Sequence, residues 1–237
     1  MIRILLPLAL LALAGPAAAA EWTPKAELGL VNTTGNSDTT SANGKFALKG
    51  EDELWTHEYF LAALRAEADD EATANRFELG AKTARRLGER QYLGSAARHE
   101  RDDFSAYEHQ STLAVNYGAW LLKEEGHTFQ LEGGPGLRHA RLADGGGSET
   151  DALLRGYADY QHQITESTQF YNTLLVEATP DNTFAQNDIG IAVSINKTLA
   201  LKAGFQARHN TEAPDGVERT DTLTSVNIVW SPRAKAN

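Results

Sequence analysis

The sequence lacks cysteine altogether. A lipid anchor at a signal-peptide cleavage site needs a cysteine, and small secreted scaffolds depend on disulfides, so both classes are excluded. The sequence also has no zinc-ligand spacing, phosphate-binding loop, nucleophile elbow or EF-hand calcium loop. We therefore predict no resident metal ion, no cofactor and no enzymatic activity.

Long apolar runs are missing after residue 20, and the mean hydropathy of the chain is −0.41. A transmembrane helix needs about 20 predominantly apolar residues, so a helical membrane protein is excluded. A membrane β-barrel is still allowed, because only every second residue of its strands must be apolar.

Basic residues are few, since 22 Lys and Arg stand against 32 Asp and Glu and the net charge is −10. Domains that bind nucleic acid usually carry a basic face, which is needed to neutralise phosphates. The acidic balance therefore argues against nucleic acid as a partner.

The first 20 residues differ in composition from the rest. Arg3 precedes a short apolar segment that ends in Ala18–Ala20. These features predict a secretory signal peptide over residues 1–20, with a retained membrane anchor as the alternative. The remaining chain, 21–237, is long enough for one all-β barrel or sandwich.

Apolar and polar residues alternate through most of the chain after residue 21. In "DIGIAVSINK", Ile189, Ile191, Val193 and Ile195 alternate with small or polar residues. Residues two apart share one face of a strand, so each such segment has an apolar face and a polar face. The segment 53–77 is rich in Leu, Ala and Glu, which leaves a helix as the alternative there. The predicted strands are 23–33, 38–50, 53–67, 73–87, 90–101, 106–122, 127–141, 151–164, 167–179, 185–197, 199–210 and 219–231.

The connections between these strands alternate in character. Brief turns occur near residues 50, 87, 123, 165 and 196, whereas "TTGNSD", "ADDEATAN", "RDDFSAY", "ADGGGSETD", "PDNTFAQ" and "TEAPDGVE" are longer or more polar. Outer-membrane barrels have short periplasmic turns and longer external loops, and only a closed sheet satisfies strand backbones in a bilayer. We therefore predict an all-β fold, an antiparallel transmembrane β-barrel of about 12 strands over 21–237, with a non-barrel tail at 232–237. A soluble periplasmic β-sandwich that binds a ligand or partner is the alternative.

Alternation also predicts which residues face the lipid and which face the lumen. Tyr107 and Tyr117 have the same parity, and ten residues at about 3.3 Å each, tilted by about 45°, span about 23 Å. This matches an apolar band of about 25 Å between aromatic girdles, so we predict that both tyrosines face the lipid. The opposite face carries charges of both signs, which can pair and narrow or plug the lumen. The predicted lumen residues are Lys45, Lys82, Glu132, Arg138, Arg155, Asp159, Lys202 and Arg208.

One short motif, His109-Gln110-Ser111, carries the only chemistry that we weighed as catalytic. A histidine and a serine two residues apart share a strand face and can act as general base and nucleophile. Asn116 or Glu132 would have to orient the histidine, and the protein would then be an outer-membrane lipid hydrolase. The simpler interpretation is a pair of strand residues near the membrane interface, so we assign no catalytic residue.

The segment 98–109, "RHERDDFSAYEH", is dense in charge. Adjacent Asp102 and Asp103 would face opposite ways on a strand, and we interpret the segment as a solvated loop with internal salt bridges, with a metal or substrate site as the alternative. Acidic residues recur in the predicted external loops, where they suggest divalent cations shared with lipopolysaccharide phosphates. These residues are Asp69, Asp70, Glu71, Asp102, Asp103, Asp144, Glu149, Asp151, Glu212, Asp215 and Glu218.

Four segments resemble the salt-induced outer-membrane protein family of Gram-negative bacteria, a family of the DUF481 type. They are "ELGLVNTTGNSDTTSANGKFAL", "RHERDDFSAYEHQSTLAVNYG", "LEGGPGLRHARL" and "RTDTLTSVNIVW". The resemblance implies a barrel in the cell outer membrane, linked to salt or envelope stress, with no established enzymatic activity. Its expected partners are the lipid bilayer, lipopolysaccharide and the outer-membrane assembly machinery. One departure is the tail "SPRAKAN" after Trp230, because outer-membrane barrels usually end on an aromatic residue.

Overall fold

The computed structural model describes residues 20–33, 39–69, 71–105, 107–143, 147–213 and 218–232, and no side chain of 31–33. The predicted signal peptide up to residue 19 and the tail from 233 lie outside the described residues. So do three of the predicted loop acids, Asp70, Asp144 and Asp215. Within the described ranges, no helix has the length and apolar character that a membrane span requires.

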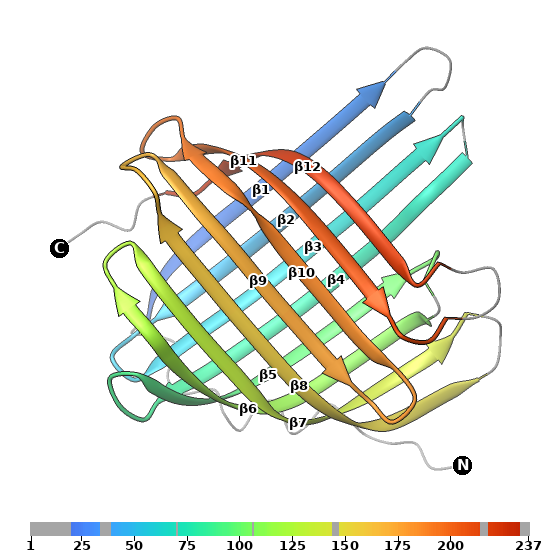
Figure 1. Cartoon of the computed structure of the whole chain (residues 1–237), viewed down its shortest axis with the longest axis horizontal. Coiled ribbons are helices and arrows are strands. Elements are labelled where there is room, and N and C mark those ends of the chain that lie inside the picture. The colour runs from blue at the N-terminus through green and yellow to red at the C-terminus, as the bar shows by residue number, and fades with distance from the viewer. Residues whose placement is uncertain are drawn as a thin grey trace.

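Twelve antiparallel strands form one closed barrel, in which each strand pairs with its sequence neighbours and β1 pairs with β12 (Figure 1). All predicted strand boundaries lie within three residues of the observed ones. The helix considered for 53–77 is wrong, because this segment forms β3 and the first residues of β4. Closure of the sheet also rules out the sandwich. The strands are β1 (Glu21–Thr33), β2 (Thr39–Glu51), β3 (Trp55–Ala68), β4 (Glu71–Arg86), β5 (Gln91–Asp102), β6 (Tyr107–Glu124), β7 (His127–Leu142), β8 (Ser148–Gln163), β9 (Thr168–Ala178), β10 (Thr183–Ser194), β11 (Leu199–Asn210) and β12 (Thr220–Trp230).

The barrel has its apolar side chains on the outside and its charged side chains inside. Leu79, Ile191 and Ile228 are exposed on the outer wall, whereas Glu100 and Asn227 are buried. A water-soluble protein shows the opposite arrangement, and an apolar exterior around a polar interior is typical of membrane barrels.

The two ends of the barrel differ in their connections. The turns at 52–54, 87–90, 125–126, 164–167 and 195–198 define what we call the short-turn end, and the other connections define the long-loop end. The predicted longer loop "ADDEATAN" is wrong, because β3 continues to Ala68 and β4 begins at Glu71. Asp69 has a φ of 51°, the left-handed conformation that tight turns require. The polar residues of this segment therefore extend the two strands beyond the apolar band and do not form a long loop.

Aromatic side chains and histidines mark the two edges of the apolar band. Near the short-turn end, Trp22 stacks on His57 and Tyr59, with ring centroids 6.2 and 6.1 Å apart. Towards the long-loop end, three outward histidines bond cross-strand hydroxyls at 2.8 Å. These pairs are His99–Ser111, His139–Thr150 and His209–Thr220. Such amphipathic side chains suit a membrane–water interface.

The prediction that two tyrosines face the lipid is confirmed for Tyr117 and wrong for Tyr107. Tyr117 is exposed on the outer wall, but Tyr107 is buried in the lumen. The ladder between β6 and β7 shifts between Tyr107 and His109, so Glu108 is an extra residue in β6. A β-bulge of this kind reverses the facing of every residue beyond it, which parity alone cannot reveal.

Candidate functional site in the barrel lumen

The inward faces of the strands form a charged lumen that contains a cavity of about 600 Å³. Five of the eight predicted lumen residues line this cavity, namely Lys45, Lys82, Arg155, Asp159 and Lys202. The other three are buried and ion-paired, so the predicted set of lumen residues is confirmed. These three are Glu132, Arg138 and Arg208.

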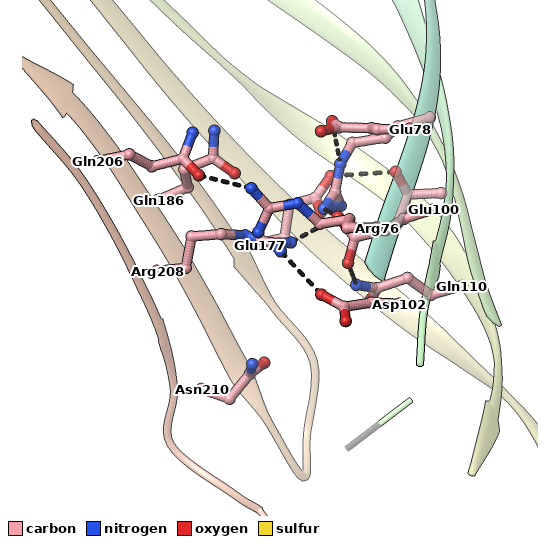
Figure 2. Close-up of polar contacts among 12 residues, drawn as sticks. Arg76, Glu78, Glu100, Asp102, Gln110, Glu177, Gln186, Gln206, Arg208 and Asn210 are labelled. Atoms are coloured by element: carbon pink, nitrogen blue, oxygen red, sulfur yellow. Dashed lines mark hydrogen bonds and ion pairs between the residues drawn. The ribbon is translucent and has the colours of Figure 1, made fainter. Parts of the chain in front are cut away.

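A network of side chains crosses the lumen on the long-loop side of the cavity. We call this network the crossbar. Figure 2 shows its side chains reaching inward from strands on two facing sides of the barrel. The crossbar comprises Arg76, Glu78, Arg98, Glu100, Asp102, Gln110, Thr112, Glu177, Gln206 and Arg208.

Arg98 on β5 is the centre of the crossbar. Its guanidinium donates to Glu78 at 2.9 Å and to Glu100 at 2.8 Å, and these two residues lie on β4 and β5. The third bond, 3.1 Å long, reaches Glu177 on β9 and so crosses the lumen. The Oγ1 of Thr112 donates to the same Glu177 carboxylate at 3.0 Å.

A second set of bonds crosses from β11. Arg208 donates to Glu100 and, at 3.4 Å, to Asp102 on the facing wall. Arg76 on β4 donates to Gln206 of β11 at 2.8 Å. Arg98 and Arg208 thus contact four carboxylates, Glu78, Glu100, Asp102 and Glu177, and Arg76 contacts a side-chain amide. Because each buried charge has opposite-charge or amide partners, the crossbar avoids the high cost of isolated buried ions.

A further ion-paired cluster narrows the lumen closer to the short-turn end. The carboxylate of Glu132 on β7 accepts from Lys82 of β4, from Arg155 of β8 at 3.1 Å and from the hydroxyl of Tyr92 at 2.6 Å. Asp159 lies on the same wall and accepts from Gln161 at 3.3 Å. This cluster forms one side of the cavity.

The opposite side of the cavity carries three lysines around one carboxylate, and we call this group the lysine cluster. Glu27 lies 2.9 Å from the ammonium of Lys25 and 2.7 Å from that of Lys202. Lys45 is opposite Glu27 in the β1–β2 register, and its ammonium lies 4.8 Å from the ring centre of Phe60. The lysine cluster gives this wall a surplus of positive charge.

Several acids predicted for external loops are instead neutralised inside the barrel. Arg138 donates to Glu149 at 2.6 Å and to Asp151 at 2.9 Å, and it lies 4.6 Å from the ring centre of the buried Tyr107. Asp102 belongs to the crossbar, whereas Asp103 lies outside. In the part of the chain that the structure describes, no three His, Cys, Asp and Glu side chains are grouped to hold a metal ion.

The interpretation of 98–109 as a solvated loop is wrong for residues 98–102 and 107–109, which belong to β5 and β6. Residues 98–102 form the end of β5 and supply Arg98, Glu100 and Asp102 to the lumen. Asp103 turns outward, as predicted from its adjacency to Asp102. Asn75 and Arg101 donate hydrogen bonds to Asp103, which lowers the pKa of its carboxyl. Alternation alone places three charged residues on one face, but only the fold reveals their partners on β9 and β11.

The structure does not join His109 to Ser111. The Oγ of Ser111 is 2.8 Å from Nδ1 of His99 on β5, and His109 instead lies 3.2 Å from Glu108. Asn116 and Glu132, the proposed orienting residues, are buried on the lumen side of the wall. The catalytic constellation that we considered as an alternative is therefore not assembled, and the recurrence of histidine–hydroxyl pairs on other strands favours an interfacial role.

Comparison with known proteins agrees with this architecture. The translocator domain of the autotransporter NalP from Neisseria meningitidis superposes with a TM-score of 0.50 at 14% identity, covering 90% of this chain and 87% of that one. The NanC porin structure also gives 0.50, at 8% identity, covering 88% of this chain and 97% of that one. At these identities the likeness concerns the fold alone, which is that of outer-membrane β-barrels.

A sequence relative and a family model identify the group to which the chain belongs. The chain is 28% identical over 172 residues to the uncharacterized protein YdiY of Escherichia coli strain K12, covering 71% of this chain and 67% of that protein. The model described as "Protein of unknown function, DUF481" matches residues 26–231, which cover β1 from Ala26 onward and the whole of β2 to β12. The chain therefore belongs to the DUF481 family.

Proposed function

We propose that this protein is an outer-membrane barrel whose lumen forms a vestibule open to the periplasm and closed towards the cell exterior by the crossbar. In this arrangement the short turns lie in the periplasm. Small polar solutes pass only when the crossbar opens. The observation that carries the proposal is the cavity of about 600 Å³, whose lining runs from Gln163 and Ser194, at the short-turn end, to Arg98.

Several features support a restricted pathway rather than a wide pore. The crossbar bonds span the lumen between β5 and both β9 and β11. The Glu132 cluster narrows the lumen again on the periplasmic side of the crossbar. Charges of both signs remain along the cavity wall, so small hydrated ions and polar solutes suit it better than apolar molecules.

The location is tested by two measurements on cell fractions. Closed membrane barrels often resist detergent until they are heated, so we expect the unboiled protein from outer membranes to migrate differently from the boiled protein on a gel. We also expect it to stay in the membrane after a high-pH wash. Release by the wash, with no mobility shift, would contradict the location.

Permeation is tested by conductance in a planar bilayer. We expect small or rare openings for the native protein and a several-fold larger, cation-preferring conductance for the double variant Arg98→Ala/Arg208→Ala. The variant removes two cations from the crossbar and leaves its carboxylates to repel one another. Arg101→Ala is the matched control, because Arg101 lies on the same strand but faces outward. Equal conductance in all three proteins would refute the closed-vestibule proposal.

The proposal includes a role in salt or envelope stress, as the resemblance to the salt-induced family implies. Ion pairs with partly exposed members, such as Lys25 with Glu27, weaken as ionic strength rises. We expect the protein to be more abundant in outer membranes from cells grown at high salt. Equal abundance at low and high salt would remove the stress role.

The surroundings that we propose are the lipid bilayer, lipopolysaccharide and the outer-membrane assembly machinery. We also propose that divalent cations bind to outward-facing acids, such as Asp103 and Glu108, together with lipopolysaccharide phosphates. Equal heat stability of the membrane-bound protein with and without a chelator would count against these cations.

A further inference from the structure

The seam at which the barrel closes is paired along only part of its length. β1 and β12 are in register over four residue pairs, from Ala26–Trp230 to Gly29–Asn227. By contrast, β1 pairs with β2 along its whole length, and β12 pairs with β11 from Thr220 to Trp230. The next pair in the same register would be Leu30 with Val226. Both residues belong to the described chain, and the ladder does not include them.

Beyond this point the two strands diverge towards the long-loop end, as Figure 1 shows for β1 and β12. We call the space between them the seam split. A bilayer offers no water to unpaired backbone groups, so barrels normally close without an edge. The seam split instead leaves two facing strand edges at membrane depth. Some molecule with both polar and apolar parts is needed to fill it.

The outer borders of the seam split are apolar. Leu28 and Leu30 are 68% and 70% exposed on β1, and Val226 and Ile228 are 52% and 58% exposed on β12. These side chains point towards the lipid, in line with the rest of the apolar band. A hydrocarbon chain from the bilayer would therefore meet apolar surface along both strands.

The apex of the seam split is polar. An amide hydrogen bond of 3.2 Å joins Asn43 on β2 to Asn227 on β12, next to Gly29. A Cβ at Gly29 would lie 2.1 Å from Oδ1 of Asn227 and 2.5 Å from Oδ1 of Asn43. Glycine is therefore required at this position for the two amides to meet. The apex thus places hydrogen-bonding groups where the apolar borders end.

The lysine cluster lies directly inside this apex. Lys45 is in register with Glu27, and Lys202 is in register with Asn227, the residue opposite Gly29. Lys25 and Lys202 share the Glu27 carboxylate, and among the described residues no carboxylate lies within ion-pair distance of Lys45. Two further carboxylates line the cavity on either side of the lysine cluster, Glu58 on β3 and Asp188 on β10. Asp188 accepts hydrogen bonds from the side-chain amides of Gln186 and Gln206 at 2.8 and 2.7 Å. The cavity lining includes residues on both sides of the seam, so the lysine cluster and the seam split face one space.

We propose that the seam binds a long-chain carboxylate that enters from the bilayer. Its carboxylate contacts Lys45 and Lys202, and its hydrocarbon chain lies in the seam split between Leu30 and Val226. The positive charge of the lysine cluster selects an anionic head group. The proposal rests on β1, β2, β11 and β12 and is independent of whether the crossbar opens.

The geometry of the seam is tested by disulfide formation, which is clean because the native chain has no cysteine. Leu28 and Ile228 are in register, so the double variant Leu28→Cys/Ile228→Cys should cross-link under mild oxidation. Leu30→Cys/Val226→Cys lies one repeat further along and would have the same pair geometry in a continuous ladder. We expect it to stay reduced. Equal cross-linking of the two variants would show a closed seam and overturn the proposal.

Ligand binding is tested with radiolabelled hexadecanoate and the purified full-length mature protein in a neutral detergent. We expect saturable binding that Lys45→Gln/Lys202→Gln weakens by about tenfold or more, the loss expected for removing a charged contact. Lys49→Gln is the matched control, because Lys49 lies on the same strand but is not part of the cavity lining. Hexadecanol, with the same chain and no charge, should bind as weakly to the native protein as hexadecanoate binds to the double variant.

Three results would overturn the proposal. The first is equal binding of hexadecanol and hexadecanoate to the native protein, and the second is equal binding of hexadecanoate to the native protein and to the double variant. The third is tighter binding of hexadecyl phosphate than of hexadecanoate, which would assign the site to a phosphate head group. The heat-dependent gel shift reports whether each variant is folded. If the double variant does not fold, Lys45→Gln alone carries the test, because the Lys45 ammonium makes no ion pair in the described structure.

Discussion

Replacing Arg98 by methionine is the sharpest test of the crossbar. The substitution keeps an unbranched side chain of similar length but removes the guanidinium that binds Glu78, Glu100 and Glu177 at 2.8–3.1 Å. Three carboxylates then face one another in the lumen with only Arg208 and Arg76 nearby.

The expected loss follows from these contacts. Hydrogen bonds to charged groups are each worth about 1.5–3 kcal/mol, but part of this sum is offset because the guanidinium no longer has to be desolvated. Breaking a buried ion pair by removing one partner costs about 3–5 kcal/mol, and we expect Arg98→Met to fall in this range. With a urea dependence of about 2 kcal/mol/M, the unfolding midpoint should fall by about 1.5–2.5 M.

The assay is urea unfolding of the refolded barrel, followed by tryptophan fluorescence. Arg101→Met is the matched control, since Arg101 is 57% exposed by its side chain and pairs with Asp103 on the outside. An exposed ion pair of this kind is worth about 0–1 kcal/mol. The further change Glu177→Leu in the Arg98→Met background should recover part of the stability by removing an unpaired charge. If Arg98→Met costs no more than Arg101→Met, the crossbar does not stabilise the barrel and the reasoning fails.

Three further predictions concern other parts of the barrel. Gly134→Ala should destabilise the barrel by about 2–3 kcal/mol in the same urea assay, because the new Cβ would lie 1.8 Å from the carbonyl oxygen of Val115. Gly133→Ala should cost far less, because the atom nearest to its new Cβ is 3.7 Å away. Equal losses of stability in the two variants would contradict the packing argument. Ser111→Ala should leave phospholipid hydrolysis by the purified protein at the background level of the native protein, and any hydrolysis that this substitution abolishes would restore the enzyme alternative. Asp52 accepts hydrogen bonds from the backbone N–H groups of Trp55 and Leu54 at the β2–β3 turn, and these bonds lower the pKa of its carboxyl below 3.8. These bonds therefore stabilise the folded barrel at any pH above the pKa of Asp52 in the unfolded chain. The stabilisation is lost as the pH falls through the pKa of Asp52 in the folded protein. The midpoint difference between native protein and Asp52→Ala should therefore be largest near neutral pH and shrink in acid, and a difference that grows in acid would show the wrong sign.

The sequence predicted the strands and their faces because alternation is a local property. Val226, Ile228 and Trp230 alternate with Asn227 and Val229, and this period alone fixes which side chains share a face. The same rule placed Lys82, Glu132 and Lys202 in the lumen, where the structure has them. It also put Asp102 and Asp103 on opposite sides of the wall.

Local alternation failed wherever one inserted residue or one distant strand decided the outcome. Glu108 is the inserted residue that turns Tyr107 into the lumen, and nothing in its side chain distinguishes it from a regular strand residue. Segment 98–109 resembles a solvated loop because it is dense in charge, and the partners that hold Arg98 and Glu100 across the lumen are distant in the sequence. Their partners, Glu177 and Arg208, lie on strands that approach only after the sheet closes.

The sequence by itself determined that the chain forms a barrel, because every strand carries one apolar face and one polar face and a bilayer permits such strands only in a closed sheet. It also determined that charges such as Lys82, Glu132 and Lys202 enter the lumen, since side-chain direction follows residue parity. Only the tertiary structure decided which charges pair across the lumen, because Arg98 meets Glu177 through closure of the barrel. It alone decided that β1 and β12 separate beyond Gly29, because the register between the first and last strands depends on the accumulated stagger of all twelve.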